Sequence, residues 1–94
     1  MIFEWNSQKN EWLKKERGVS FEQIIFHLYQ GDLWKTSDHP DQIKYPGQKI
    51  YYVIMDDYIY LVPYKKETAH IFLKTIIPSR KATQDYKKEI GEIL

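Results

Sequence analysis

The strongest constraint on the fold comes from residues 48–64, QKIYYVIMDDYIYLVPY. β-Branched and aromatic residues fill both halves of this stretch, and such residues favour strands. The Asp56–Asp57 pair between the halves is related to the Asp-Gly pair that makes tight hairpin turns. Both faces of the first half are apolar, with Ile50, Tyr52 and Ile54 on one and Tyr51, Val53 and Met55 on the other. This predicts a hairpin whose first strand is either interior in a sheet or exposes an aromatic face to a partner.

Two further strands are expected around this hairpin. Residues 69–77, AHIFLKTII, follow a turn at KKET and continue the meander, while IFEW near the start predicts a short strand. Alternation places Ile71, Leu73, Thr75 and Ile77 on one face of the later strand, and His70, Phe72, Lys74 and Ile76 on the other. The charge of Lys74 predicts that the second of these faces meets solvent. Residues 35–47 are dense in Asp, Pro and Gly, so we expect one long irregular loop there.

Three helices are expected from capping residues and apolar spacing. Asn6 can cap a helix over residues 7–17 that ends at Gly18. Ser20 and Gln23 form a capping box for a second helix, which Gly31 closes. A third helix near the end is expected to be capped by Thr83. The apolar stripe of the second helix comprises Phe21, Ile24, Ile25, Leu28 and Tyr29, and that of the third comprises Tyr86, Ile90, Ile93 and Leu94.

Length and composition exclude several classes of protein. A chain of 94 residues suits one domain over residues 1–94, and 43% hydrophobic with 29% charged residues is far from the composition of disordered chains. Cysteine is absent, so neither disulfides nor a thiolate zinc site is expected. The sequence has no Asp/His cluster with the spacing of metal ligands and no Gly-rich phosphate loop, so we expect the protein to use no metal ion and no cofactor. No apolar run is long enough to cross a bilayer, and we expect a cytoplasmic location without membrane contact.

The charge of the chain is unevenly distributed. The net charge is only +1, well below that of a dedicated nucleic-acid binder. Residues 1–63 hold seven Lys/Arg against nine Asp/Glu, whereas residues 64–94 hold seven against four. The positive excess therefore lies in the last third, where it indicates either an anion-binding surface or lysines such as Lys66, Lys87 and Lys88 that only solvate the protein.

Three stretches together resemble the BrnT family of type II toxins. The chain opens with Phe-Glu-Trp-Asn, turns at Gly-Val-Ser-Phe-Glu within residues 3–23, and closes with a strand that runs into Arg-Lys-Ala-Thr within residues 76–86. The resemblance implies an α+β, RelE-like fold, with two N-terminal helices and a C-terminal helix packed on one face of a twisted antiparallel sheet of three to four strands. It also implies metal-independent RNA cleavage that inhibits translation, and a sheet face open to RNA.

The same resemblance implies a cognate antitoxin, a small DNA-binding protein, and a higher-order toxin–antitoxin complex. The chain departs from the family at Glu16–Arg17, where members usually carry Lys-His, and it is less basic than they are. Arg17 can replace the positive charge of the family's Lys-His pair, but it cannot accept a proton as the histidine can, because arginine stays protonated near neutral pH. This departure favours an alternative: a catalytically degenerate binding module that pairs with a DNA-binding partner and acts in transcriptional regulation.

Metal-independent RNA cleavage needs a base, an acid, and cations for the charge that develops on the phosphate. Arg80 is the first candidate cation because its planar fork holds phosphate with two hydrogen bonds. Lys81 and Lys74 can add positive charge. His70 shares strand parity with Lys74 and is the candidate base, with His39 in the loop as the alternative. Arg80 can instead pair with Glu11 or Glu16 of the first helix.

Further residues are candidates for holding RNA. Unpaired bases commonly stack on aromatic rings, and the chain has eight tyrosines, of which Tyr52, Tyr60 and Tyr64 are the candidates. The alternative for these three is packing within the sheet. Arg17 and Lys87 are the candidate contacts to the RNA backbone.

Overall fold

The computed structural model describes residues 1–92, and in this part of the chain three helices accompany six strands, which confirms the α+β class and the three helices. The helices are α1 (Ser7–Arg17), α2 (Phe21–Tyr29) and α3 (Arg80–Glu89). The strands are β1 (Ile2–Glu4), β2 (Leu33–Asp38), β3 (Gln48–Met55), β4 (Tyr58–Glu67), β5 (His70–Leu73) and β6 (Ile77–Pro78). No helix in residues 1–92 has the length and apolar character of a membrane span.

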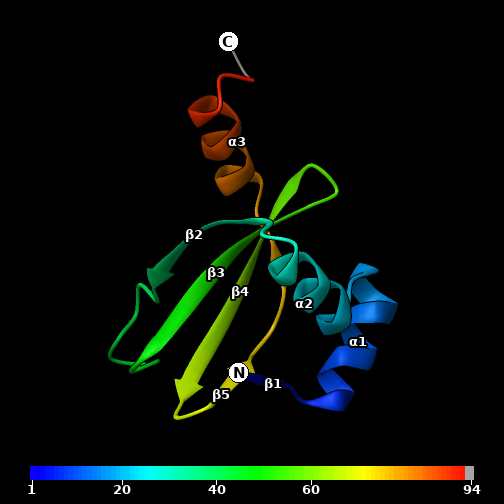
Figure 1. Cartoon of the computed structure of the whole chain (residues 1–94), viewed down its shortest axis with the longest axis vertical. Coiled ribbons are helices and arrows are strands. Elements are labelled where there is room, and N and C mark those ends of the chain that lie inside the picture. Colours follow the sequence, from blue (N-terminus) through cyan, green and yellow to red (C-terminus); the bar gives the residue numbers. More distant parts are fainter. Residues whose placement is uncertain (93–94) are drawn as a thin grey trace.

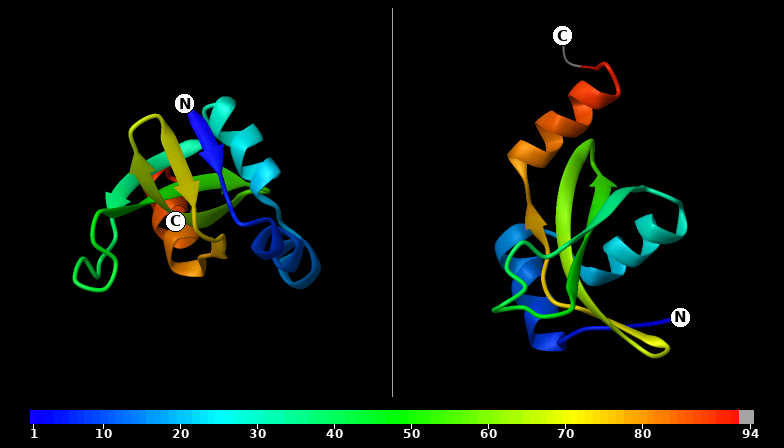
Figure 2. Two further views of the ribbon diagram at one scale, coloured as in Figure 1. Left: turned by 90° about the horizontal axis from the view of Figure 1, so that it is seen from below. Right: turned by 90° about the vertical axis from the view of Figure 1, so that its left-hand side faces the viewer.

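The strands form one twisted sheet in the order β1-β5-β4-β3-β2, and β6 pairs with β4 beyond the end of β5 (Figures 1 and 2). The expected antiparallel sheet of three to four strands is therefore wrong in two respects. The sheet has six strands, and it is mixed because β1 pairs with β5 in parallel. The central hairpin is confirmed. Asp56 and Asp57 have φ angles of 54° and 57°, the left-handed pair that a type I′ turn requires.

β2 occupies part of the segment that we expected to be a long loop. Its residues pair antiparallel with β3, so β3 is an interior strand between β2 and β4. The sequence LWKTSD gave no clear strand signal because β2 is an edge strand whose side chains are all at least partly exposed. The irregular connection shrinks to residues 39–47, between the ends of β2 and β3.

The ends of α1 and α2 follow the expected local signals. Asn6 Oδ1 accepts a hydrogen bond from the Lys9 amide at 2.9 Å, and Gly18 is left-handed with φ 66°. Ser20 and Gln23 make both bonds of the capping box. The two helices cover one face of the sheet, where the core includes Leu13, Phe21, Ile24, Val53, Val62 and Leu73. Tyr29 is an exception to the predicted stripe, because it lies at the end of α2 and is 75% exposed.

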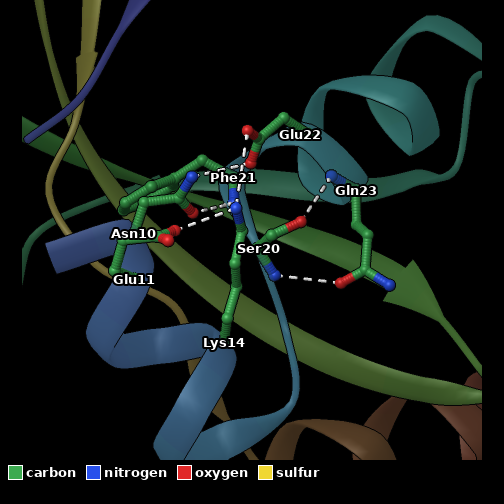
Figure 3. Close-up of polar contacts among 7 residues, drawn as sticks. All are labelled: Asn10, Glu11, Lys14, Ser20, Phe21, Glu22 and Gln23. Atoms are coloured by element: carbon green, nitrogen blue, oxygen red, sulfur yellow. Dashed lines mark hydrogen bonds and ion pairs between the residues drawn. The ribbon is translucent and has the colours of Figure 1, made fainter. Parts of the chain in front are cut away.

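A polar cluster joins α1 to the start of α2 (Figure 3). Asn10 is 4% exposed, and its Oδ1 accepts a hydrogen bond from the Phe21 amide at 2.9 Å while its Nδ2 donates to Glu22 at 2.7 Å. The pKa of Glu22 is lowered, chiefly by this bond from Asn10. The side chain of Asn10 thus fixes the angle at which α2 leaves α1.

α3 extends beyond the Asp56–Asp57 end of the sheet, apart from α1 and α2 (Figure 1). Its cap is Ser79, whose Oγ accepts from the Ala82 amide at 3.1 Å, and not Thr83 as expected. Thr83 is buried in the first turn, where its hydroxyl accepts from the Ile59 amide and donates to the Ser79 carbonyl. Of the predicted stripe, Ile90 is 53% exposed; Ile93 and Leu94 lie outside the described residues.

The alternation expected for residues 69–77 fails after Leu73. Ile71 and Leu73 face the core as predicted, but residues 74–76 leave the sheet between β5 and β6. Ile76 is consequently fully buried and Ile77 is 39% exposed, the reverse of the expectation. The Arg17 guanidinium donates to the Ile76 carbonyl at 2.5 Å and so ties the end of α1 to this irregular segment.

Candidate functional site

The sheet has a second face, opposite the one that α1 and α2 cover. Because side chains alternate along a strand, this second face carries Glu4, Lys35, Ser37, Ile50, Tyr52, Leu61, Pro63, Lys65, His70 and Phe72. The first turn of α3 reaches it at one end, next to Tyr52 and Leu61. The expectation that all three helices pack on one face is therefore wrong. Two hollows, of about 200 and 220 Å³, lie on the second face.

The first hollow, which we call the His70 hollow, forms where three strands meet. It is lined by Glu4, Lys65, Glu67, His70, Phe72 and Lys74. The strand register brings these residues together, because the parallel β1–β5 pairing sets Glu4 beside Phe72 and the β4–β5 pairing sets Lys65 beside Phe72 and Glu67 beside His70. Residues that are distant in the sequence thus share one surface depression.

The His70 hollow contains a histidine held by a carboxylate. His70 Nδ1 lies 2.7 Å from Glu4 Oε1, and the two side chains are 48% and 51% exposed. An ionised carboxylate can only accept a hydrogen bond, so Nδ1 is the donor in this contact with Glu4. When the ring is neutral, the lone pair is on Nε2. This is the orientation that an imidazole needs to take a proton from a bound molecule.

Two lysines line the His70 hollow together with the imidazole. Lys74 Nζ lies 4.8 Å from the centre of the Phe72 ring, and Lys65 Nζ lies 3.8 Å from Glu67 Oε1. With Glu4 and Glu67, the hollow contains two ammonium groups and two carboxylates, so its charge is balanced when His70 is neutral. The hollow can therefore hold an anion only beside the lysines and away from the carboxylates.

The second hollow, which we call the Trp34 hollow, lies between the sheet and the start of α3. It is lined by Trp34, Lys35, Tyr52, Leu61, Ser79, Lys81, Ala82 and Asp85. Trp34 and Tyr52 meet edge to face at 5.8 Å, and Lys35 Nζ lies 4.3 Å from the Trp34 ring and 5.0 Å from the Tyr52 ring. Lys81 Nζ is 3.5 Å from Asp85 Oδ2. Aromatic faces and ammonium groups are thus adjacent.

The structure divides the predicted catalytic residues between these places. His70 and Lys74 share the His70 hollow, whereas Lys81 lines the Trp34 hollow with Tyr52. Arg80 lines neither hollow. It is the first residue of α3 and is exposed, and within residues 1–92 it makes no ion pair, so the alternative pairing with Glu11 or Glu16 is not formed either. The expected convergence of Arg80 with Lys74 and His70 does not occur.

Two of the tyrosines that we expected to hold RNA face the helices instead. Tyr64 is 6% exposed and stacks on Tyr51 with ring centres 3.9 Å apart. Burial raises the pKa of Tyr64, and it raises the pKa of Tyr51 to about 12 with a further contribution from the Tyr64 hydroxyl. Tyr60 packs against the core cluster, and burial raises its pKa too. Strand alternation puts Tyr60 and Tyr64 on the helix-covered face, so sheet packing is their observed role.

The other candidate contacts are engaged elsewhere. The Arg17 guanidinium bonds to the Ile76 carbonyl and lies 5.0 Å from the Trp12 ring centre. Lys87 Nζ bonds to Asp57 Oδ2 at 2.9 Å, and this bond raises the Lys87 pKa. His39 packs against Tyr45, with tilted rings whose centres are 4.4 Å apart, in the connection after β2 and outside both hollows.

Among the residues that line the two hollows, the sequence reasoning missed Glu4, Lys65, Trp34 and Lys35 as site candidates. Glu4 reaches His70 through a parallel pairing that no local pattern reveals. Lys65 was read as part of a turn, although β4 continues to Glu67. Trp34 and Lys35 lie at the border of the segment read as a loop. The adjacent Trp34 and Lys35 were the signal in the sequence that could have indicated the Trp34 hollow.

No group of three or more His, Cys, Asp or Glu residues among residues 1–92 is arranged to hold a metal ion. The chain matches no protein-family model, no curated protein sequence and no solved structure. The geometry of the two hollows is therefore the basis on which a function can be argued.

Proposed function

We propose that this chain is a ribonuclease toxin of a type II toxin–antitoxin system, similar to the BrnT family and RelE-like in fold. It cleaves RNA without a metal ion and inhibits translation in the cytoplasm, and a small DNA-binding antitoxin neutralises it, in a higher-order complex with it. One observation carries the proposal: a carboxylate-oriented histidine, His70, shares an exposed hollow with two lysines on the sheet face that α1 and α2 leave uncovered.

The chemistry follows from the orientation of His70. Its Nε2 takes the proton from a ribose 2′-OH, and the resulting oxygen attacks the neighbouring phosphorus. The bond from phosphorus to the 5′ oxygen of the next nucleotide breaks, which leaves a 2′,3′-cyclic phosphate on one product and a 5′-OH on the other. The leaving 5′ oxygen receives a proton from an ammonium group or water. Glu4 keeps the ring oriented and stabilises the imidazolium that forms.

The lysines act on the phosphate. During attack, negative charge gathers on the non-bridging oxygens of the phosphate, and fixed cations lower the energy of that state. Lys65 and Lys74 are the cations that line the hollow with His70. Phe72 forms part of the same hollow and offers a ring surface to the base next to the scissile bond.

A specific observation favours a second candidate, the binding module. Glu4 and Glu67 stand in the His70 hollow against its two lysines, and Arg80 lies outside it. A balanced charge attracts an anionic polymer weakly. In this second candidate the chain binds a DNA-binding partner and acts in transcriptional regulation without cutting RNA.

Cleavage of single-stranded RNA by the purified chain in EDTA separates the two candidates. The full chain should release products with cyclic phosphate ends. His70→Ala should slow cleavage by about 100-fold or more, because a general base typically supplies that much. His39→Ala is the matched control, since His39 lies outside both hollows, and should cut at the original rate. RNA that stays intact at every protein concentration would leave the binding module as the surviving candidate.

The same variants can be tested in cells. Expression without the antitoxin gene should stop growth and degrade RNA, and His70→Ala should relieve both effects while His39→Ala should not. Arg80→Ala is informative as well. Since Arg80 lies outside the His70 hollow, we expect this variant to keep more activity than His70→Ala. Equal growth with the original chain and with His70→Ala would contradict the toxin proposal.

A further inference from the structure

We propose that the Trp34 hollow binds one nucleotide of a single-stranded nucleic acid, with the base stacked on Tyr52 and the adjoining phosphate held by Lys35 and Lys81. The identification of the polymer as RNA rests on the proposed function. The existence of the subsite rests on the hollow itself, which is separate from the His70 hollow and shares no residue with it.

The two aromatic rings are held in place at their polar ends. The Trp34 indole N–H donates to Glu89 of α3, and the Trp34 ring packs at 5.3 Å against Tyr86. The Ser37 hydroxyl lies 3.3 Å from the Tyr52 hydroxyl, in hydrogen-bonding range. Lys35 Nζ lies over both rings, 4.3 Å from the Trp34 ring centre and 5.0 Å from the Tyr52 ring centre, and all three residues line the hollow, so a face of each ring is directed to it. A rigid aromatic face is the surface on which an unpaired base stacks.

The cations of the hollow are available to a phosphate. Lys35 makes no ion pair within residues 1–92, and its ammonium group rests against the two rings instead. An exposed ammonium over a ring is held more weakly than a stacked base, so a base can displace it toward the phosphate. Lys81 makes one long contact with Asp85 at 3.5 Å and is 87% exposed, so it can also turn to an anion.

Size and position fit one unit of a longer chain. The hollow is about 220 Å³, below the range of roughly 300–1,000 Å³ typical of pockets that enclose a whole small-molecule ligand. Leu61 lines this hollow and Lys65 lines the His70 hollow, four residues further along β4. At about 3.3 Å per residue the two hollows are roughly 13 Å apart along the strand. A short single strand can therefore reach both.

A binding measurement that excludes cleavage tests the subsite. The probe is a fluorescein-labelled 2′-O-methyl RNA hexamer, which has no free 2′-OH inside the chain and cannot be cut by the proposed chemistry. Fluorescence anisotropy gives its Kd for the full chain. Tyr52→Leu should weaken binding by about 10- to 100-fold, the loss of one stacked base, whereas Tyr52→Phe should stay within about 3-fold. Tyr45→Leu, in the connection between β2 and β3, is the matched control and should bind normally.

Lysine variants supply a measurement that does not depend on the packing of Tyr52. Lys35 is exposed, so Lys35→Ala should fold as the original chain does. For single strands the slope of log K against log salt falls by about 0.7 for each phosphate contact removed. Lys35→Ala should therefore reduce that slope by about 0.7, and Lys44→Ala, in the loop, should leave it unchanged. A double-stranded hexamer of the same sequence should bind more weakly, because its bases are not free to stack.

The outcomes distinguish this inference from the proposed function. Binding that depends on Tyr52 and Lys35 supports the subsite even when the chain cuts no RNA. The original chain can cut RNA while Tyr52→Leu and Lys35→Ala bind the hexamer with the same Kd as the original chain. That result overturns the subsite and leaves the ribonuclease proposal standing. Failure to bind the hexamer at all overturns the subsite.

Discussion

Replacing Asn10 by alanine should destabilise the protein more than the small size of the asparagine side chain suggests. The side chain of Asn10 is buried, and its carbonyl oxygen accepts the bond from the Phe21 amide at 2.9 Å. No backbone group of a preceding helical turn is available to that amide, because Phe21 is the first residue of α2. In Asn10→Ala the Phe21 amide therefore stays buried without an acceptor; Figure 3 shows the bond from this amide to Asn10 that is lost.

The size of the effect can be worked from the two bonds. An unsatisfied buried amide costs about 1–3 kcal/mol. The second bond, from Asn10 Nδ2 to Glu22, adds about 0.5 kcal/mol or less, because the Glu22 side chain is 57% exposed and solvent can replace its partner. We expect a total loss of about 2 kcal/mol in the free energy of unfolding. For a domain of this size that corresponds to a Tm roughly 8–16 °C lower.

Urea unfolding followed by tryptophan fluorescence and by circular dichroism measures this loss. Glu22→Gln is the matched control, since it alters the exposed bond and leaves the Phe21 amide paired; it should cost under about 0.5 kcal/mol. An Asn10→Ala variant as stable as Glu22→Gln would refute the reasoning, because it would show that the buried amide of Phe21 finds another acceptor at little cost.

Three further predictions concern the sheet and its turns. The folded-state pKa of Tyr51 is raised to about 12, so the stability that its neutral hydroxyl supports is present below pH 10 and is lost as pH rises toward 12; urea midpoints should fall less over that interval in Tyr51→Phe than in the original chain. Thr83→Val keeps the shape of the side chain but leaves the Ile59 amide without its acceptor, and it should cost about 1–3 kcal/mol in urea unfolding. Thr68 adopts a left-handed φ of 45°, which is strained for a β-branched residue, so Thr68→Gly should raise the Tm, with a gain of about 0.5–1 kcal/mol measured calorimetrically.

Features that depend on neighbouring residues could be predicted from the sequence. The Asn6 cap, the capping box at Ser20 and Gln23, and the Asp56–Asp57 turn each involve residues within a few positions of one another, and all three form as expected. The predicted cap at Thr83 was wrong because of a contact that is distant in the sequence. Ser79 and Thr83 both offered a hydroxyl, and Thr83 is instead drawn into the first turn by its bond to the Ile59 amide, a partner 24 residues away.

The candidate site depended on pairings that local signals do not carry. His70 and Lys74 could be placed on one face by alternation, but Glu4 joins them because β1 pairs in parallel with β5. Arg80 is only six positions beyond Lys74 in the sequence, yet the irregular residues 74–76 and the run of β6 along β4 carry it to the other end of the sheet.

The sequence by itself thus determined the three helices and the central hairpin with its turn, since these follow from capping, turn residues and the period of apolar side chains, whereas the edge strand β2 left no such signal. Beyond that hairpin, tertiary structure alone decided which strands are neighbours, which tyrosines are covered, and which charges share a hollow. The physical reason is that sheet register is fixed by hydrogen bonds between distant segments. A shift of one residue in that register would exchange the two faces and separate His70 from Glu4.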